Sequence, residues 1–168
     1  MTTSTVTRCA WCGTDPLYMD YHDNEWGVPK KDDQELFELL LLEGAQAGLS
    51  WITILKKRDN YRAAFDGFNA KKMAAYTQEK HDALLQNSGI IRNKLKVSAF
   101  SKNANAYLAI KESGISFSDF LWQFTDHKVI KNAWKTLADI PTSTPESEAM
   151  SKALKKAGFS FVGPTICY

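Results

Sequence analysis

The chain has 168 residues, which is enough for one domain with a sizeable hydrophobic core. Apolar residues make up 44% and charged residues 24%, which is ordinary for a globular protein and unlike a disordered or fibrous chain. The net charge of +2 gives no overall argument for nucleic-acid binding, so any basic footprint must be local.

The N-terminal residues 1–8 are polar and we expect them to be disordered, ahead of a single helical domain from 9 to 168. No stretch resembles a signal peptide or a membrane span, which predicts a cytoplasmic protein without a membrane partner. In that compartment the three cysteines indicate thiols or metal ligands rather than disulfides. Cys9 and Cys12 form a weak C-x-x-C pattern, whereas Cys9 and His22 could form half of a Cys/His zinc site.

A helix with an unusual carboxylate follows an aromatic and polar segment. Asp32 is the expected N-cap, with Glu35 completing a capping box. Leucines between 36 and 40 form an apolar stripe at helical spacing, and Glu43 occupies the next step of that stripe. Glu43 is therefore either the polar floor of a pocket or an ordinary glutamate that is turned to solvent.

Aromatic residues flank Glu43 in the sequence and could form a box for a flat ligand, since ring faces stack on nucleobases and attract cations. Taken singly, each of them is better explained by core packing. They are Trp11, Tyr18, Tyr21, Trp26 and Trp51.

The rest of the chain is typical of a series of helices, because no alternating apolar run is long enough for a strand. Capping residues, glycines and prolines mark their ends. We expect them at 50–58, 61–65, 71–76, 77–87, 92–112, 117–124 and 144–157, which predicts an all-α fold in one compact domain.

The C-terminal stretch has the form of a helix-hairpin-helix. Pro145 begins a helix, Gly158 ends it, and Pro164 can begin a second helix directly after Gly163. Such a turn exposes backbone N–H groups that suit a phosphate, and lysines between 152 and 156 lie beside it. The bare pattern equally describes a plain C-cap and turn, which the residues alone favour.

Four stretches carry a family resemblance: DPLYMDYHDNEWGVP, LFELLLLEGAQAGLSWITILKKRDNYRAAF, GIIRNKLKV and KALKKAGFSFVGPTICY. They resemble the bacterial DNA-3-methyladenine glycosylase I family of the constitutive Tag type, within the helix-hairpin-helix superfamily. The likeness runs from about Cys9 to Tyr168. It implies a monofunctional enzyme that hydrolyses the N-glycosidic bond of 3-methyladenine in alkylated double-stranded DNA. The free base would leave, an abasic site would remain, and we expect the enzyme to be a monomer.

The resemblance also assigns roles to the residues around the expected pocket. Glu43 matches a residue used in base recognition and is the best catalytic candidate. Tyr21 and Trp51 match residues that stack on the base. The remaining walls of the base-binding pocket would come from Trp11, Tyr18 and Trp26.

Two segments are expected to contact DNA. The break at Gly48 and Leu49 can fill the gap that an extruded base leaves, although a simple helix-to-helix turn explains it as well. With the resemblance, the hairpin residues Gly158, Gly163 and Thr165 are expected to bring backbone groups to DNA phosphates.

The resemblance implies a structural Zn²⁺ ion, which the given sequence can hold only in part. Cys9 and His22 match its two N-terminal ligands, and Cys12 matches none. The other two ligands of the family belong to a tail after the ICY segment, so two of the expected four are present. Two rival functions remain: a non-catalytic helix-hairpin-helix module that only binds DNA, and a zinc-dependent regulator.

Overall fold

Capping residues set where several helices begin and end. In the computed structural model, which describes residues 5–168, the Asp32 side chain accepts a hydrogen bond from the Glu35 N–H and begins helix α2, Asp33–Gln46. This confirms the expected N-cap, although the reciprocal bond of a capping box is not formed. Thr144 forms a full capping box at the start of α8, Pro145–Ala157, which ends at Gly158 with φ 107°.

The described residues form α-helices and short 3₁₀ helices (η), with no strand among them, which confirms the all-α prediction. The remaining bounds are η1 Ala10–Cys12, α1 Pro16–Asn24, α3 Trp51–Ala64, η2 Asp66–Phe68, α4 Ala70–Ala74, α5 Gln78–Leu85, α6 Lys94–Glu112, α7 Phe117–Trp122, η3 Gln123–Thr125, η4 Leu137–Asp139 and α9 Pro164–Cys167.

Two helices differ from the sequence-based expectation. The aromatic segment before Pro29 contains α1, because the Asp15 side chain accepts a hydrogen bond from the Leu17 N–H and Pro16 occupies the first helical position. Helix α3 continues to Ala64, so the expected break between 58 and 61 was wrong. No glycine or proline interrupts that stretch, and Tyr61 is buried on the same helix.

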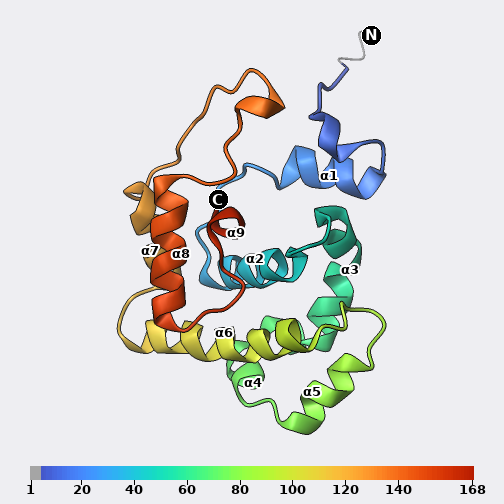
Figure 1. The fold of residues 1–168 in the computed structure, drawn as a ribbon, viewed down its shortest axis with the longest axis vertical. Helices are drawn as coiled ribbons and strands as arrows, with labels where there is room; N and C mark the ends of the chain where they lie inside the picture. Colours follow the sequence, from blue (N-terminus) through green and yellow to red (C-terminus); the bar gives the residue numbers. More distant parts are fainter. Residues whose placement is uncertain (1–4) are drawn as a thin grey trace.

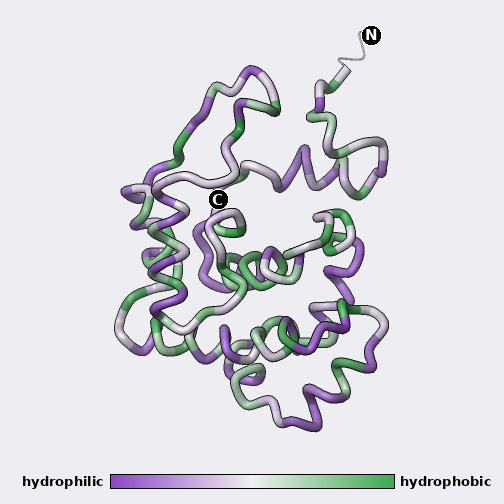
Figure 2. Tube along the Cα trace, in the orientation of Figure 1, coloured by the Kyte–Doolittle hydropathy of each residue, from purple (hydrophilic) through white to green (hydrophobic). Residues whose placement is uncertain are grey.

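Helix α2 lies at the centre of the molecule and contacts α3, α6, α7 and α9 (Figure 1). It is largely hydrophobic along its length (Figure 2) and buries Phe37, Leu41 and Leu42 almost completely. Helix α1 lies at the edge of the fold and packs chiefly on α3 and η1. This arrangement places Glu43 on the central helix, near the junction of α2 and α3.

The sequence analysis also made a prediction about each end of the chain. Residues 1–4 of the expected disordered segment lie outside the described residues, and Arg8 at its other end binds Asp23 at 2.7 Å. At the C-terminus, α8 is followed by a six-residue turn, 158–163, and by the four residues of α9. That α8, this turn and α9 form a DNA-binding helix-hairpin-helix stays a prediction. Among residues 5–168 no helix is both long and apolar enough to cross a membrane.

Candidate active site

Glu43 is a half-buried carboxylate that no charge or hydrogen bond from the described residues 5–168 stabilises. It lies near the C-terminal end of α2, between the buried Leu42 and Gly44. Burial alone raises the pKa of Glu43 to about 7, because the charged form loses solvation and gains no compensating partner. Such a group is expensive to keep in a folded protein, and perturbed carboxyls of this kind concentrate at functional sites.

The predicted aromatic residues do gather in space, around Trp11. Its ring centroid lies 5.0 Å from that of Tyr18, 6.4 Å from that of Tyr21 and 5.2 Å from that of Trp26. The Tyr21 ring in turn lies 5.6 Å from the Trp51 ring. We call these five side chains the aromatic cluster. They come from three elements, η1, α1 with its C-terminal end, and the first residue of α3.

The aromatic cluster adjoins Glu43. Burial raises the pKa of Tyr21 to about 12, and the neighbouring Glu43 carboxylate adds to that effect. Burial also raises the pKa of Tyr18, again with a contribution from Glu43. The structure therefore brings Glu43, Tyr18 and Tyr21 together, as the sequence analysis expected. Trp26 is the outermost member, with 46% of its surface exposed.

Trp51 carries a second unsatisfied polar group. Its indole Nε1 is the one fully buried side-chain nitrogen or oxygen within residues 5–168 that has no hydrogen-bond partner. Buried polar groups are almost always paired, so an orphaned N–H on one ring of the aromatic cluster, together with the uncompensated Glu43, indicates a site that a ligand would complete. Nothing in the sequence signals this donor, because the spacing of tryptophans does not reveal whether an indole N–H is paired.

The two rings expected to sandwich a ligand touch each other here. The Tyr21 and Trp51 centroids are 5.6 Å apart with an interplanar angle of 51°. A flat ring between two others needs a separation of about 7 Å, which is two stacking distances of about 3.5 Å. For a base to enter between these two rings, α1 and α3 would therefore have to move apart by roughly 1–2 Å.

Two ion pairs fasten α1 to α3, and the sequence analysis missed both. Lys56 lies 3.1 Å from the carboxylate of Asp15, the N-cap of α1. Arg58 donates two hydrogen bonds, of 2.7 and 2.9 Å, to Glu25, the C-cap of α1. The guanidinium holds the pKa of Glu25 below its usual range. Both ends of the helix that carries Tyr21 are thus held by cations on one turn of α3.

The expected break between α2 and α3 is an exposed turn. Gly48 is exposed and has φ 78°, a backbone conformation that few other residue types tolerate. Leu49 is 37% exposed, and the Gln46 side chain donates a 2.7 Å hydrogen bond to its carbonyl. The structure thus presents Leu49 to solvent on a tightly closed turn, as a wedge would require.

The hairpin residues lie on the turn after α8 and at the start of α9. A Cβ added at Gly163 would meet no atom within 4 Å, so the backbone there is open to an approaching partner. Thr165 is exposed, and Gly158 adopts φ 107° at the C-cap of α8.

Comparison with known proteins decides the family. The sequence matches the family model described as methyladenine glycosylase over residues 11–168. This chain belongs to the methyladenine glycosylase family.

Family members of known name and structure are similar over almost the whole chain. The DNA-3-methyladenine glycosylase of Haemophilus influenzae is 56% identical over 163 residues, covering 97% of this chain and 88% of that protein. DNA-3-methyladenine glycosylase 1 of Escherichia coli is 55% identical, covering 97% of this chain and 87% of that protein. A crystal structure of 3-methyladenine DNA glycosylase I has a TM-score of 0.95 and 56% identity, and covers 96% of this chain and 89% of that chain.

A further family structure holds the base itself. It is a tyrosine-to-phenylalanine variant of 3-methyladenine DNA glycosylase I in complex with 3-methyladenine. Its TM-score is 0.92 at 38% identity, and the match covers 96% of this chain and 87% of that chain. At that similarity the fold of this family member is the fold of the glycosylase I structures.

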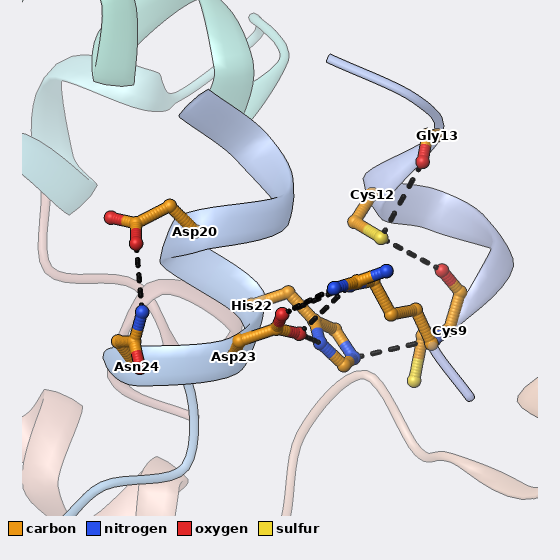
Figure 3. A network of polar contacts seen from close by, with 8 residues as sticks. Cys9, Cys12, Gly13, Asp20, His22, Asp23 and Asn24 are labelled. Carbon is orange, nitrogen blue, oxygen red and sulfur yellow. Dashed lines mark hydrogen bonds and ion pairs between the residues drawn. The ribbon is translucent and has the colours of Figure 1, made fainter. Parts of the chain in front are cut away.

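The two predicted metal ligands lie close together in this family member (Figure 3). The Cys9 N–H lies 3.3 Å from His22 Nε2, while His22 Nδ1 lies 2.9 Å from an Asp23 oxygen. The Cys12 thiol points instead to the Cys9 carbonyl, at 3.2 Å. No cluster of three or more metal-binding side chains occurs among residues 5–168. The contact between the two expected ligands runs through the Cys9 backbone, and Asp23 is positioned to orient the imidazole of His22.

Proposed function

We propose that this chain hydrolyses the N-glycosidic bond of 3-methyladenine in alkylated DNA and leaves an abasic site. The observation that carries the proposal is Glu43, an uncompensated carboxylate beside the aromatic cluster of a methyladenine glycosylase family member. The relatives of 55% and 56% identity carry this activity in their names. A non-catalytic binding module or a zinc-dependent regulator has no comparable support.

The pocket chemistry suits the damaged base. Methylation at N3 gives the adenine of a nucleotide a delocalised positive charge, and the electron-rich faces of Tyr21 and Trp51 attract a cationic ring. Glu43 would accept a hydrogen bond from the exocyclic amine and complement the charge. Trp11, Tyr18 and Trp26 would limit the size of the base that enters.

Little chemical assistance is needed once the base is bound. The bond between the sugar C1′ and the purine N9 breaks, and its electron pair leaves with the base, which thereby becomes neutral. A water oxygen bonds to C1′ and one proton is released. Because the leaving group departs neutral, the barrier is lower than for a normal purine, and binding and positioning supply most of the acceleration. We therefore give Glu43 a recognition role and do not assign it as a general base.

We propose that DNA is held at two places outside the pocket. The target must leave the base stack before these side chains can touch it. The exposed turn with Gly48 and Leu49 would occupy the vacated space. The hairpin, with Gly158, Gly163 and Thr165, would bind the phosphate backbone through its N–H groups, which suits the open surface at Gly163.

We also propose a structural Zn²⁺ site that uses Cys9 and His22 as two of about four ligands. The hydrogen bond between His22 Nδ1 and Asp23 supports this, because it orients the imidazole and leaves Nε2 as the nitrogen for a metal ion, which would replace the hydrogen bond that Nε2 now accepts from the Cys9 N–H. When bound, the ion would stabilise the segment before α1. We further propose that the enzyme acts in the cytoplasm as a monomer, since the pocket is built from one copy of the chain.

The deciding experiment measures methylated bases released from alkylated DNA. Incubation with the purified protein should release free 3-methyladenine, identified by chromatography, and the Glu43→Gln variant should release it far more slowly. Specific DNA binding without any release would favour the non-catalytic module. Zinc-dependent DNA binding without release would favour the regulator instead.

A further inference from the structure

Lys96 is a buried cation that pairs with no carboxylate among residues 5–168. Only 8% of its surface is exposed, and its Nζ donates hydrogen bonds of 2.9 Å to the Ala45 carbonyl and 2.6 Å to the Ala47 carbonyl. These carbonyls belong to the last turn of α2 and to its C-cap, where the helix dipole is negative, so a cation stabilises them. The next residue along the chain is Gly48, the start of the exposed turn that carries Leu49.

Asn103 holds the other proposed DNA-contact segment from the same helix, α6. Its side chain is 3% exposed; the amide donates to the Ser160 carbonyl at 3.0 Å and accepts from the Ser160 N–H at 2.8 Å. Lys102 adds a 2.9 Å hydrogen bond to the Ser160 hydroxyl. The next hairpin residue, Phe161, has φ 58°, and its carbonyl oxygen lies 3.0 Å from where a Cβ on Gly44 would stand. The hairpin turn is thus seated on α6 and directly on α2.

Lys96 and Asn103 lie on one face of α6. They are seven residues apart, about two helical turns or roughly 10.5 Å along the axis. Ala99 and Phe100, buried between them, fix that face against the core. A single rigid stretch of helix therefore determines how far the Leu49 turn lies from the hairpin turn at 158–163.

We propose that Lys96 and Asn103 are positioning residues for base extrusion, which fix the distance between the wedge at Leu49 and the phosphate-binding hairpin. This rests on the proposed function of both segments. Extrusion from a duplex requires that the protein grip the backbone and fill the stack at a fixed separation, since a small misplacement costs much of the rate. A base that is already unstacked, in single-stranded DNA, makes a smaller demand on that separation.

The test compares base release from double-stranded and single-stranded DNA treated with the same methylating agent. In Lys96→Met, which keeps the length of the side chain but loses the charge and both hydrogen bonds, release from duplex should fall about tenfold or more. Release from single strands should fall less than about threefold. Affinity for free 3-methyladenine, followed by tryptophan fluorescence, should stay within about twofold, because Lys96 does not touch the pocket. Lys94→Met, an exposed lysine in the first turn of the same helix, is the matched control and should change nothing.

An equal loss on both DNA substrates by a folded variant, or no loss on either, would overturn the proposal. Should Lys96→Met fail to fold, as judged by far-ultraviolet circular dichroism, Asn103→Asp decides the question from the hairpin end. That change keeps the acceptor for the Ser160 N–H and removes the donor to its carbonyl, and the same duplex-selective loss is expected. If the unaltered protein releases no 3-methyladenine from either DNA, the proposed function itself fails, which is a distinguishable result.

Discussion

Aromatic side chains gather at two places in this molecule, and the two places differ in kind. One is the core between α3, η2 and α6, where Phe65 and Phe68 are fully buried and Phe100 is 3% exposed. Their rings pack closely, with centroids 4.6 Å apart for Phe65 and Phe100. The other is the aromatic cluster, where Tyr21 is buried, Trp11, Tyr18 and Trp51 are half-buried, and Trp26 is 46% exposed.

The polar groups beside the rings explain the difference. In the core, the Tyr61 hydroxyl accepts a 3.1 Å hydrogen bond from the Ile91 N–H, so its buried oxygen is satisfied. Beside the aromatic cluster, neither the Glu43 carboxylate nor the Trp51 N–H has a compensating partner within the part of the chain that the structure describes. Unsatisfied groups lower the stability of the fold, and they are kept where a ligand makes use of them. Aromatic content alone therefore does not identify a site; unpaired polar atoms beside the rings do.

The largest effect should come from breaking the core. We expect Phe65→Ala to lower the free energy of unfolding by about 3–5 kcal/mol, because it deletes a fully buried ring and leaves a cavity. Urea denaturation measures this, and the folded protein should still bind free 3-methyladenine normally. Trp26→Ala is the control from the aromatic cluster and should cost less than about 1 kcal/mol. A large loss of stability in Trp26→Ala would mean that the aromatic cluster is core after all.

Glu43→Gln should show that this carboxylate weakens the fold while serving the ligand. The pKa of Glu43 is raised from 4.5 to about 7, so below pH 4.5 it is protonated in both states and costs nothing. As the pH rises from 4.5 to 7 the unfolded state ionises first, and above pH 7 the full penalty of roughly 3 kcal/mol applies. The variant should therefore be more stable than the parent at pH 8 and equal to it near pH 4.

Binding should change in the opposite direction. Loss of a charge-assisted hydrogen bond should weaken affinity for 3-methyladenine by about 10- to 100-fold near pH 8. The rate of base release by the parent should rise with pH through about 7, as Glu43 ionises, and the variant should lack that rise. Unchanged affinity in Glu43→Gln would remove this residue from the pocket.

The sequence was sufficient where local chemistry decides the structure. Thr144, Pro145 and Gly158 supply the cap, the first residue and the terminator of α8, and the observed helix has the expected bounds. The leucine stripe likewise predicted helix α2 with Glu43 on it, although it left open whether Glu43 faces a pocket or solvent. These features depend on residues within a few positions of one another, so a pattern along the chain can carry them.

Features that depend on distant partners were not predictable. The ion pair between Glu25 and Arg58 joins residues that are 33 positions apart, and no periodicity in the sequence indicates such a pair. The pairing state of the Trp51 N–H and the closeness of the Tyr21 ring depend on how α1 sits on α3. The helical state of α1 itself is indicated locally, because Asp15 and Pro16 form a cap and first-position pair.

Trp51→Ala should separate stacking from packing. If the indole stacks on the base, its removal should weaken binding of free 3-methyladenine by about 1–3 kcal/mol, measured by calorimetry. Trp122→Ala is the control, since that indole donates a 2.7 Å hydrogen bond to the Lys30 carbonyl away from the aromatic cluster. It should leave base affinity unchanged. Equal affinities for the Trp51→Ala variant and the parent would assign Trp51 to packing.

The smallest effect should come from weakening the attachment of helix α1, which carries Tyr21, to α3. In Arg58→Met the bidentate bond to Glu25 is lost, and since these side chains are only 21% and 27% exposed we expect a stability loss of about 1 kcal/mol. Base affinity should fall by a few-fold at most, because α1 is then less firmly placed against α3. Lys56→Met breaks the more exposed pair with Asp15 and should have no measurable effect. The double change Glu25→Arg with Arg58→Glu should recover the affinity for the base if the ion pair positions α1. A gain of affinity in Arg58→Met would instead mean that the contact between the Tyr21 and Trp51 rings opposes the entry of the base.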